Sequence, residues 1–169
     1  MLFEKWLVPD RVFPDFRAVT PELLCAGGIR FVFSDIDNTV ATYDDPTPPP
    51  DVVRWIEELT AAGIRVVFVS NNDRARVEGF VEPIKARGYW KAGKPLVRVL
   101  RQAMRDAGAG AGESLLFGDQ LLTDCAAGKR LGMPVWIVPP IKDKTTLFWR
   151  VKRAIEKPYM RIYEKKKRT

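Results

Sequence analysis

Four aspartates carry most of the chemistry that this sequence can support. Asp35 and Asp37 stand one residue apart in "FVFSDIDNTV", and Asp119 and Asp124 stand in "LLFGDQLLTD". Each pair follows an apolar run. Along a strand, residues i and i+2 point to the same side, so the charges of Asp35 and Asp37 repel each other. This crowding indicates a bound cation. Because oxygen ligands without His or Cys select a hard ion, we expect Mg²⁺.

A metal-bound carboxylate at this position suggests phosphoryl transfer. Asp35 can attack phosphorus and form an aspartyl phosphate, which water then hydrolyses. Asp37 is placed to protonate the leaving oxygen and later to activate the water. The charge on the transferring group needs donors, and Ser70, the Asn71 backbone and the Lys94 ammonium could supply them.

Each of these signals alone also has a simpler interpretation. The Asp-x-Asp pair fits an ordinary loop turn, Ser70-Asn71-Asn72 fits a helix N-cap, and Lys94 fits a solvated lysine. Asp119 fits a plain strand-to-helix turn, and Asp124 a surface helix position. We favour one phosphatase-type site because all the signals occur in order, each at a strand exit or a helix start.

Composition excludes several other kinds of chemistry. The chain has no histidine, which rules out Ser-His-Asp and Cys-His nucleophiles and His-ligated zinc. Cys25 and Cys125 predict reduced, packed thiols rather than a disulfide framework or a metal quartet. The apolar runs are far shorter than the roughly 20 residues of a membrane span, and "MLFEKWLVPD" does not fit a signal peptide. We therefore expect a cytosolic protein.

The elements that must position the site alternate along the chain. Apolar runs predict buried strands at 30–35, 65–70, 114–119 and 134–139, with a short strand at 88–91. Helical patterns occur at 50–63, 73–88 and 94–108, and Pro83 should kink or end the second helix. This alternation predicts an open α/β fold with a parallel sheet. Such sheets bind ligands at the carboxyl ends of their strands, where the candidate residues lie.

Apolar spacing also predicts which face of each helix is buried. The residues expected to face the core are Val53, Ile56 and Leu59 in the first helix and Leu96, Val99, Leu100 and Met104 in the third.

Four short motifs resemble those of the haloacid dehalogenase superfamily of phosphatases. These are "DIDNT", "VFVSNN", "KAGKP" and "GDQLLTD", in this order and spacing. More narrowly, "SDIDNTVATYDDPTPPP", "SNND" and "GDQLLTD" resemble the YqeG-type branch of the class IIIA phosphatases, which is similar to the phosphatidylglycerophosphate phosphatases of mitochondria and plastids. The resemblance covers about residues 30–140. It implies a Rossmann-like three-layer fold. The length of 169 residues and the 46% of hydrophobic residues predict a single domain, residues 1–169, which would be the phosphatase domain.

The resemblance also implies a role for each motif residue. It makes Asp35 the nucleophile and Asp37 the acid/base, and it assigns phosphate binding to Ser70 and Lys94. Mg²⁺ would be held by Asp35, the Asp37 carbonyl and Asp119, with Asp124 supporting that shell. The eukaryotic lipid phosphatases tend to have Lys-Asp-Asn-Cys at 36–39, where this chain has Ile-Asp-Asn-Thr. That difference bears on the substrate and leaves the enzyme class unchanged.

A receiver domain is the nearest rival fold, because it also combines clustered aspartates, Mg²⁺, a hydroxyl and a lysine. It places its phosphoacceptor aspartate after the third strand and its paired acids after the first. Here the Asp-x-Asp pair with the candidate nucleophile Asp35 follows the first predicted strand. The order of the motifs therefore disfavours a receiver domain.

The spacing of the motifs bears on substrate size. Asp35 and Ser70 are 35 residues apart, and Ser70 and Lys94 are 24 residues apart. Each interval has room for a loop and one helix, so we expect no cap domain. A site without a cap cannot enclose a small metabolite by itself. This favours a bulky phosphomonoester: a lipid headgroup, a protein or a nucleic-acid end.

The C-terminal segment, residues 142–169, is strongly basic. It has eleven Lys or Arg against three Asp or Glu, a net charge of +8, so residues 1–141 carry −1 of the total +7. Residues 145–157 predict an amphipathic helix whose apolar face is Leu147, Phe148, Val151 and Ile155. This helix fits either packing on the domain with a solvated basic end, or peripheral binding to an anionic surface, membrane or RNA.

Two functions of different classes remain open. The first is an Mg²⁺-dependent phosphomonoesterase, with phosphatidylglycerophosphate as the best single substrate and a peripheral position on the inner membrane face as one option. The second is a weakly catalytic module that binds RNA or the ribosome through the basic tail. The presence of Asp37 favours the enzyme, since a module that had lost catalysis would not need an acid/base there.

Overall fold

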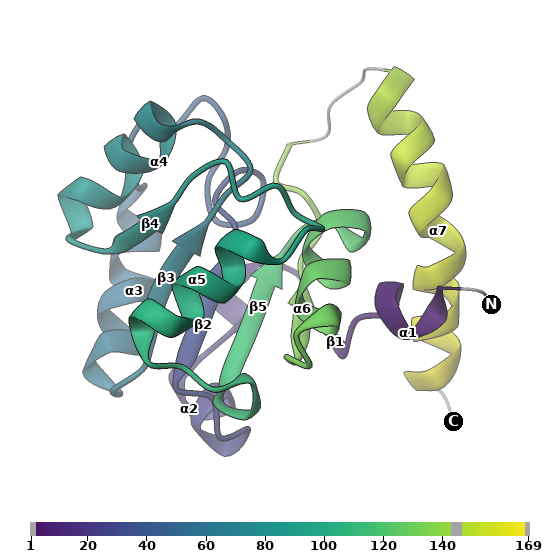
Figure 1. The fold of residues 1–169 in the computed structure, drawn as a ribbon, viewed down its shortest axis with the longest axis horizontal. Helices are drawn as coiled ribbons and strands as arrows, with labels where there is room; N and C mark the ends of the chain where they lie inside the picture. Colours follow the sequence, from purple (N-terminus) through teal and green to yellow (C-terminus); the bar gives the residue numbers. More distant parts are fainter. Residues whose placement is uncertain (1–2, 143–146, 168–169) are drawn as a thin grey trace.

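The protein is built on a central parallel β-sheet. The computed structural model describes residues 3–142 and 147–167, and within them the sheet has six strands in the order β1-β6-β5-β2-β3-β4 (Figure 1). All neighbouring strands are parallel, which confirms the predicted α/β class. The strands are β1 (Arg11–Val12), β2 (Phe31–Ser34), β3 (Arg65–Val69), β4 (Arg87–Tyr89), β5 (Ser114–Gly118) and β6 (Val135–Ile137).

Four of the predicted strands lie inside their expected ranges, and two details differ. β4 begins one residue before the predicted short strand at 88–91. β1 was not predicted, because two residues, Arg11 and Val12, are too few to give a hydrophobic period. It lies at the sheet edge beside β6.

Helices cover both faces of the sheet. They are α1 (Glu4–Leu7), α2 (Pro21–Ala26), α3 (Pro50–Ala61), α4 (Arg74–Val81), α5 (Arg98–Ala107), α6 (Ala126–Arg130) and α7 (Leu147–Lys167). As predicted, Pro83 ends the helical run: α4 ends at Val81 and a 3₁₀ turn, Glu82–Ile84, follows. Figure 1 shows α7 at the edge of the molecule beside α1, with α3 and α4 on the opposite side.

Alternating strand residues divide the core into two layers. Val32 of β2 packs in the layer that includes residues of α2, α3 and α4, whereas Phe31 and Phe33 pack in the layer of α1, α5, α6 and α7. Successive side chains of a strand point to opposite faces, so a strand buried on both faces needs apolar residues throughout. This explains the continuous apolar runs in the sequence.

Two predictions about helix faces were wrong in detail. In α3 the buried residues include Val52 rather than the half-buried Val53. The third helix begins at Arg98, not 94, so Leu96 lies before it and is 66% exposed. The loop from Lys94 to Val97 is needed to bring Lys94 into the site described below.

The apolar face predicted for the tail helix is turned away from the domain where it can be judged. Val151 and Ile155 are 52% and 48% exposed, whereas Glu156 and Tyr159 are buried. Residues 143–146 and 168–169, and the side chains of Leu147 and Phe148, lie outside the described residues. The helix also continues through Pro158 to Lys167, beyond the expected end at 157. In the part of the chain that the structure describes, no helix is long and apolar enough to span a bilayer.

Candidate active site

The carboxyl ends of the strands bring the predicted residues together. β2 lies between β3 and β5, so the segments that follow these strands meet at one edge of the sheet. A cavity of about 260 Å³ opens there. Its lining includes six of the seven predicted residues: Asp35, Asp37, Ser70, Asn71, Lys94 and Asp124. The seventh, Asp119, is 1% exposed and lies directly beside Asp35 and Asp124.

Three buried carboxylates form the centre of the site. One oxygen each from Asp35, Asp119 and Asp124 can be chosen so that all lie within 4.8 Å of one another. Burial raises the pKa of Asp119 well above its usual value, and the charges of Asp124 and Asp35 raise it further. Neither carboxylate oxygen of Asp119 has a hydrogen-bond partner among the described residues. Such oxygen-only, negatively charged donors fit a hard divalent cation.

Lys94 is the cation that the cluster already contains. Its Nζ lies 2.9 Å from Asp35 Oδ1 and 2.7 Å from Asp124 Oδ1, and it donates to the Val69 carbonyl (2.6 Å). Burial lowers the pKa of Lys94, but Asp124 and Asp35 raise it by more, so the ammonium stays charged. Burial likewise raises the pKa of Asp35, to about 6, although Lys94 opposes the shift.

Asp37 is held by Asn72, one of the polar residues after the second predicted strand, and by Arg76, which sequence reasoning missed. Arg76 Nε donates to Asp37 Oδ1 (3.0 Å), and Asn72 Nδ2 donates to Asp37 Oδ2 (3.1 Å). Arg76 also donates to the carbonyl of Thr42 (3.0 Å) and to that of Asp45, so it ties the loop after β2 to α4. Arg76 belongs to none of the motifs and looks like a surface helix residue, so no sequence signal marked it.

Asn71 contributes through its side chain as well as its position. Its Nδ2 donates to the Lys94 carbonyl (3.0 Å), and the Lys94 N–H donates to Asn71 Oδ1 (2.7 Å). This pair of bonds fixes the loop that carries Lys94. Ser70 is buried, and its Oγ accepts from the Asn72 N–H (3.1 Å). The phosphate-binding roles of Ser70 and of the Asn71 backbone stay predictions.

A close approach explains the Gly-Asp order of the last motif. The chain leaves β5 at Gly118 and enters a π-helical turn, Leu121–Cys125. A Cβ on Gly118 would lie 2.6 Å from Asp124 Cβ, too close for any other residue. The Gln120 N–H donates to Asp124 Oδ2 (3.2 Å), which holds this carboxylate beside the cluster. Glycine therefore lets Asp119 and Asp124 share one turn.

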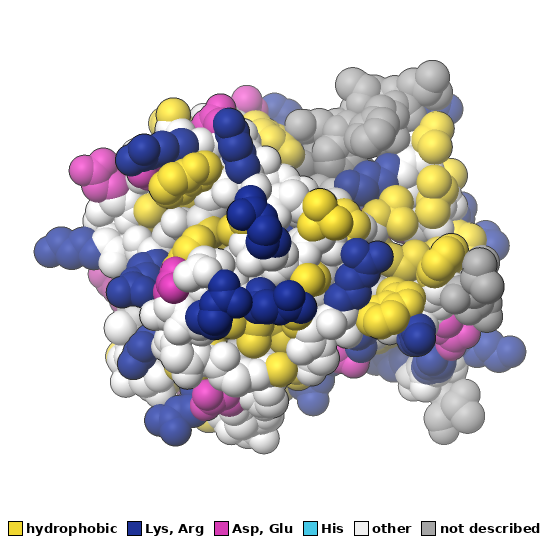
Figure 2. Space-filling view, in the orientation of Figure 1, with side chains coloured by type: hydrophobic (Ala, Val, Ile, Leu, Met, Phe, Trp, Pro, Cys, Tyr) yellow, Lys and Arg dark blue, Asp and Glu magenta, His cyan; other side chains and the backbone are white. Residues whose placement is uncertain are grey.

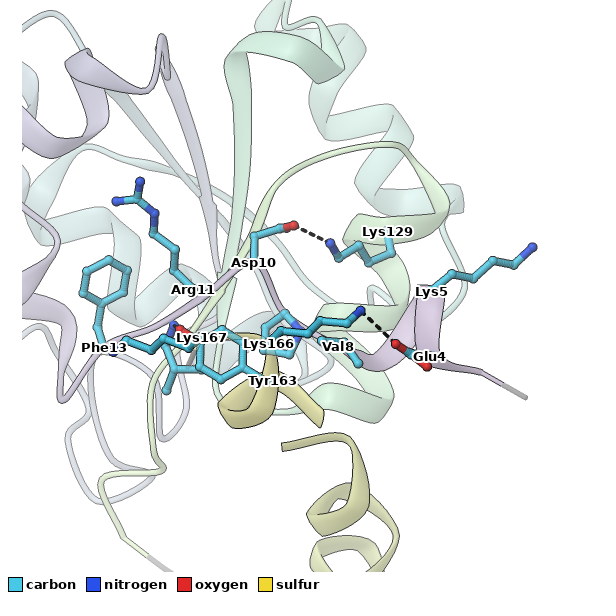
Figure 3. A pocket seen from close by; sticks show the side chains of 12 residues that line it. Glu4, Lys5, Val8, Asp10, Arg11, Phe13, Lys129, Tyr163, Lys166 and Lys167 are labelled. Atoms are coloured by element: carbon cyan, nitrogen blue, oxygen red, sulfur yellow. Dashed lines mark hydrogen bonds and ion pairs between the residues drawn. The ribbon is translucent and has the colours of Figure 1, made fainter. Parts of the chain in front are cut away.

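A larger cavity lies elsewhere. It measures about 610 Å³ and is formed by residues of α1, β1, α6 and α7 (Figure 3). Lys129 pairs with Asp10 (2.6 Å) and Lys166 with Glu4 (2.8 Å) at its walls. None of the predicted catalytic residues lines it. The chemistry of the acidic centre therefore belongs to the smaller cavity.

The sequence matches a hydrolase family. A family model described as "haloacid dehalogenase-like hydrolase" matches residues 3–132. The chain belongs to this family, as its motifs predicted. "Probable phosphatase YqeG" from Bacillus subtilis (strain 168) is 31% identical over 165 residues, covering 98% of this chain and 96% of that protein. Both findings support the predicted enzyme class, a phosphatase of the haloacid dehalogenase type.

Solved structures with low sequence identity share the fold. The cobalt-bound deoxy-D-mannose-octulosonate 8-phosphate phosphatase of Haemophilus influenzae matches with a TM-score of 0.54 at 14% identity, over 82% of this chain and 91% of that one. A Legionella pneumophila protein assigned to subfamily III A of the superfamily matches with a TM-score of 0.55 at 20% identity, over 70% and 71% of the two chains. These matches bear on the fold alone.

Proposed function

We propose that this protein is an Mg²⁺-dependent phosphomonoester hydrolase that forms an aspartyl phosphate on Asp35. The observation that carries the proposal is the buried Asp119 carboxylate beside Asp35 and Asp124, for which the described part of the chain offers no hydrogen-bond partner. Asp35, Asp119, Asp124 and the Asp37 carbonyl would hold the ion. Bound Mg²⁺ would neutralise charge on the phosphoryl oxygens and on the carboxylates.

The side chains then divide the reaction between them. The Asp35 carboxylate oxygen attacks phosphorus, and the bond from phosphorus to the leaving oxygen breaks. Asp37, oriented by Arg76 and Asn72, gives its proton to that oxygen, and in the second step it takes a proton from the attacking water. Inorganic phosphate leaves and Asp35 is restored. Lys94 offsets the negative charge of the transferring group throughout.

The proposed substrate is a bulky phosphomonoester, and phosphatidylglycerophosphate is the best single candidate. The 35 residues between Asp35 and Ser70 contain α3 and a loop, and the 24 between Ser70 and Lys94 contain α4, a 3₁₀ turn and β4. Intervals of this size favour an open site. An open site suits a phosphate displayed on a large molecule or surface.

The outer face of α7 supports a peripheral encounter with an anionic membrane. Val151 and Ile155 are exposed, and the exposed cations Arg150, Lys157 and Arg161 lie near them along the helix. Figure 2 shows apolar side chains gathered over α7. Apolar side chains flanked by cations suit the boundary between headgroups and acyl chains, and each basic residue near the surface contributes about 1 kcal/mol.

A substrate screen tests the enzyme class. We expect the full-length protein to hydrolyse p-nitrophenyl phosphate and phospholipid monoesters with Mg²⁺, to lose activity in EDTA and to regain it when Mg²⁺ is restored. Sugar phosphates serve as the small-substrate arm. Full activity in a metal-stripped sample would refute the metal dependence, and no hydrolysis of any phosphomonoester would refute the function.

Vesicle flotation tests the membrane part separately. We expect the protein to float with anionic vesicles at low salt and less at moderate salt, and the variant with Val151→Glu and Ile155→Glu to float less. Glu164→Gln, on the same helix, is the matched control. No flotation of the wild type at either salt would shift the proposal to a soluble or nucleoprotein partner, for which RNA binding is then measured.

A further inference from the structure

A buried glutamate of α7 contacts the turn that contains Asp124 and that begins two residues after Asp119. Glu156 Oε1 accepts from the Leu121 N–H (2.9 Å) and from the Leu122 N–H (3.1 Å). Glu156 is only 3% exposed. It lies 35 residues from Leu121 in the sequence, so a distant helix holds this turn.

The turn needs this partner because its first N–H groups have no acceptor within the helix. The Leu121–Cys125 turn begins directly after Gln120, whose side chain makes no capping bond. Unsatisfied N–H groups at a helix start favour a negative charge, and a side chain of the preceding residue usually supplies it. Here Glu156 takes that role from outside the turn. Asp119 lies two residues before Leu121, and Asp124 lies within the turn.

Contacts on both sides of Glu156 hold α7 in place. Towards the site, Lys152 Nζ donates to Gln120 Oε1, while Arg153, within α7 itself, lies 3.5 Å from Glu156 Oε2. At the far end, the Val12 N–H donates to Tyr163 Oη (3.0 Å), and the Lys166–Glu4 ion pair joins α7 to α1 (Figure 3). The capping carboxylate therefore sits on a docked helix with fixed ends.

Burying this carboxylate is unfavourable unless it is satisfied. Burial raises the pKa of Glu156, which the Leu122 N–H and the Arg153 charge partly oppose. An apolar side chain could fill the same space without this desolvation. The contacts of Glu156 thus point to the turn rather than to packing. Asp119 lines a cavity of about 340 Å³ together with Arg153 and Glu156, so α7 lies directly against the acidic centre.

We infer that Glu156 is a positioning residue that holds Asp119 and Asp124 in the geometry that binds the metal ion. The inference rests on the proposed function for the assignment of these two carboxylates to the ion. Outer partners of metal ligands commonly change metal affinity by about 10–100-fold when removed. Docking of α7 thereby raises the affinity of Asp119 and Asp124 for the metal ion.

The test measures metal binding and local opening, without relying on turnover. Mn²⁺, which shares the oxygen preference of Mg²⁺, is titrated into full-length protein and free Mn²⁺ is followed by electron paramagnetic resonance. Amide hydrogen exchange is measured over residues 120–125. We expect Glu156→Ala to weaken Mn²⁺ binding about tenfold and to speed exchange there, because the turn loses its acceptor.

Two matched variants separate positioning from general damage. Glu156→Gln keeps an oxygen acceptor at the same reach, so its Mn²⁺ affinity should stay within about threefold of the wild type. Glu164→Ala makes the same change at an exposed position of α7 and should alter neither readout. If Glu156→Ala does not fold, Glu156→Asp replaces it, because its carboxylate is one methylene too short to reach both N–H groups.

The outcomes distinguish this inference from the proposed function. Unchanged Mn²⁺ affinity and unchanged exchange in folded Glu156→Ala, or in Glu156→Asp, would overturn the inference. So would a wild type that binds no Mn²⁺. Hydrolysis of p-nitrophenyl phosphate is followed in parallel. A wild-type protein that binds Mn²⁺ but hydrolyses nothing would overturn the proposed function. The inference about Glu156 would then still be decided by Mn²⁺ affinity and by amide hydrogen exchange.

Discussion

The acidic centre and the helix α7 bury charged groups for different reasons. At the centre, Asp35, Asp119 and Asp124 repel one another, and Lys94 is the cation between two of them. In α7 a single carboxylate, Glu156, is satisfied by backbone N–H groups. The first arrangement has three carboxylates and one ammonium, so its excess negative charge suits a cationic ligand. The second is fully hydrogen-bonded and suits a structural link. Burial of charge therefore has to be interpreted from its partners.

Removing the nucleophile should give the largest effect. Asp35→Asn keeps the size of the side chain and relieves repulsion, so the fold should persist while hydrolysis falls on the order of 10⁴-fold or more. Asp44→Asn is the matched control, because Asp44 is exposed and pairs only with Lys142 among the ion pairs of the described residues. Turnover near the wild-type rate in Asp35→Asn, with p-nitrophenyl phosphate as substrate, would exclude Asp35 as the attacking group.

Substitutions on the two faces of α7 should differ in their effect on the free energy of unfolding. Tyr159 is 7% exposed in the core layer of α7, so Tyr159→Ala should lower the free energy of unfolding by about 3 kcal/mol. Ile155 is 48% exposed, and Ile155→Ala should stay within about 0.5 kcal/mol of the wild type. Urea unfolding followed by circular dichroism measures both. Equal losses would contradict the docking face described here.

Disturbing the acid/base should be milder than removing the nucleophile. Arg76→Ala frees Asp37 from its ion pair and frees the loop carbonyls that Arg76 holds, so kcat should fall about 10²-fold. Arg74→Ala, in the same helix, removes an exposed pair with Glu78 and is the control. The effect should be larger for an alkyl phosphate, whose leaving oxygen needs a proton, than for p-nitrophenyl phosphate. The reverse order would contradict the role given to Asp37.

The stabilisation of the protein by Mg²⁺ should depend on pH. In the metal-free protein burial raises the pKa of Asp35 from its ordinary value of 3.8 to about 6. A carboxyl group whose pKa is raised in the folded state contributes stability that is present below about pH 4 and is lost as pH rises through about 6. The rise in Tm on adding Mg²⁺ should therefore be larger at pH 7.5 than at pH 5, because the ion needs ionised carboxylates. Differential scanning calorimetry in EDTA and in Mg²⁺ measures it, and a larger rise at pH 5 would contradict the metal site.

The centre could be predicted from the sequence because its residues are tied to local signals. Asp35, Ser70 and Asp119 each follow a buried strand of the same parallel sheet, so topology alone brings them to one edge. Predicting the place of Lys94 required a motif as well, because Lys94 lies in a loop and does not directly follow a strand. The prediction of a helix from residue 94 missed this loop, since apolar spacing continues through Leu96.

The contacts that support the site could not be predicted in the same way. Arg76 meets Asp37 across 39 residues, and Glu156 meets Leu121 across 35, and neither leaves a local pattern. The side of α7 that docks on the domain could not be predicted for a related reason. Helical period identifies an apolar stripe, but a buried carboxylate with two N–H partners can outweigh two apolar side chains in setting the docked face. Such a partner becomes visible only in the folded chain.

The most direct test of the central claim is to trap the phosphoryl group on Asp35. In Asp37→Asn, p-nitrophenolate can still leave without a proton, whereas the attacking water lacks its base. With p-nitrophenyl phosphate and Mg²⁺, we expect a burst of p-nitrophenolate stoichiometric with the chain, and acid quenching followed by mass spectrometry should find a phosphoryl adduct on the peptide that contains Asp35. The same adduct should be absent from Asp35→Asn. The account would be contradicted if the wild-type protein turns over the substrate while Asp37→Asn gives neither burst nor adduct. It would also be contradicted if the adduct persists in Asp35→Asn.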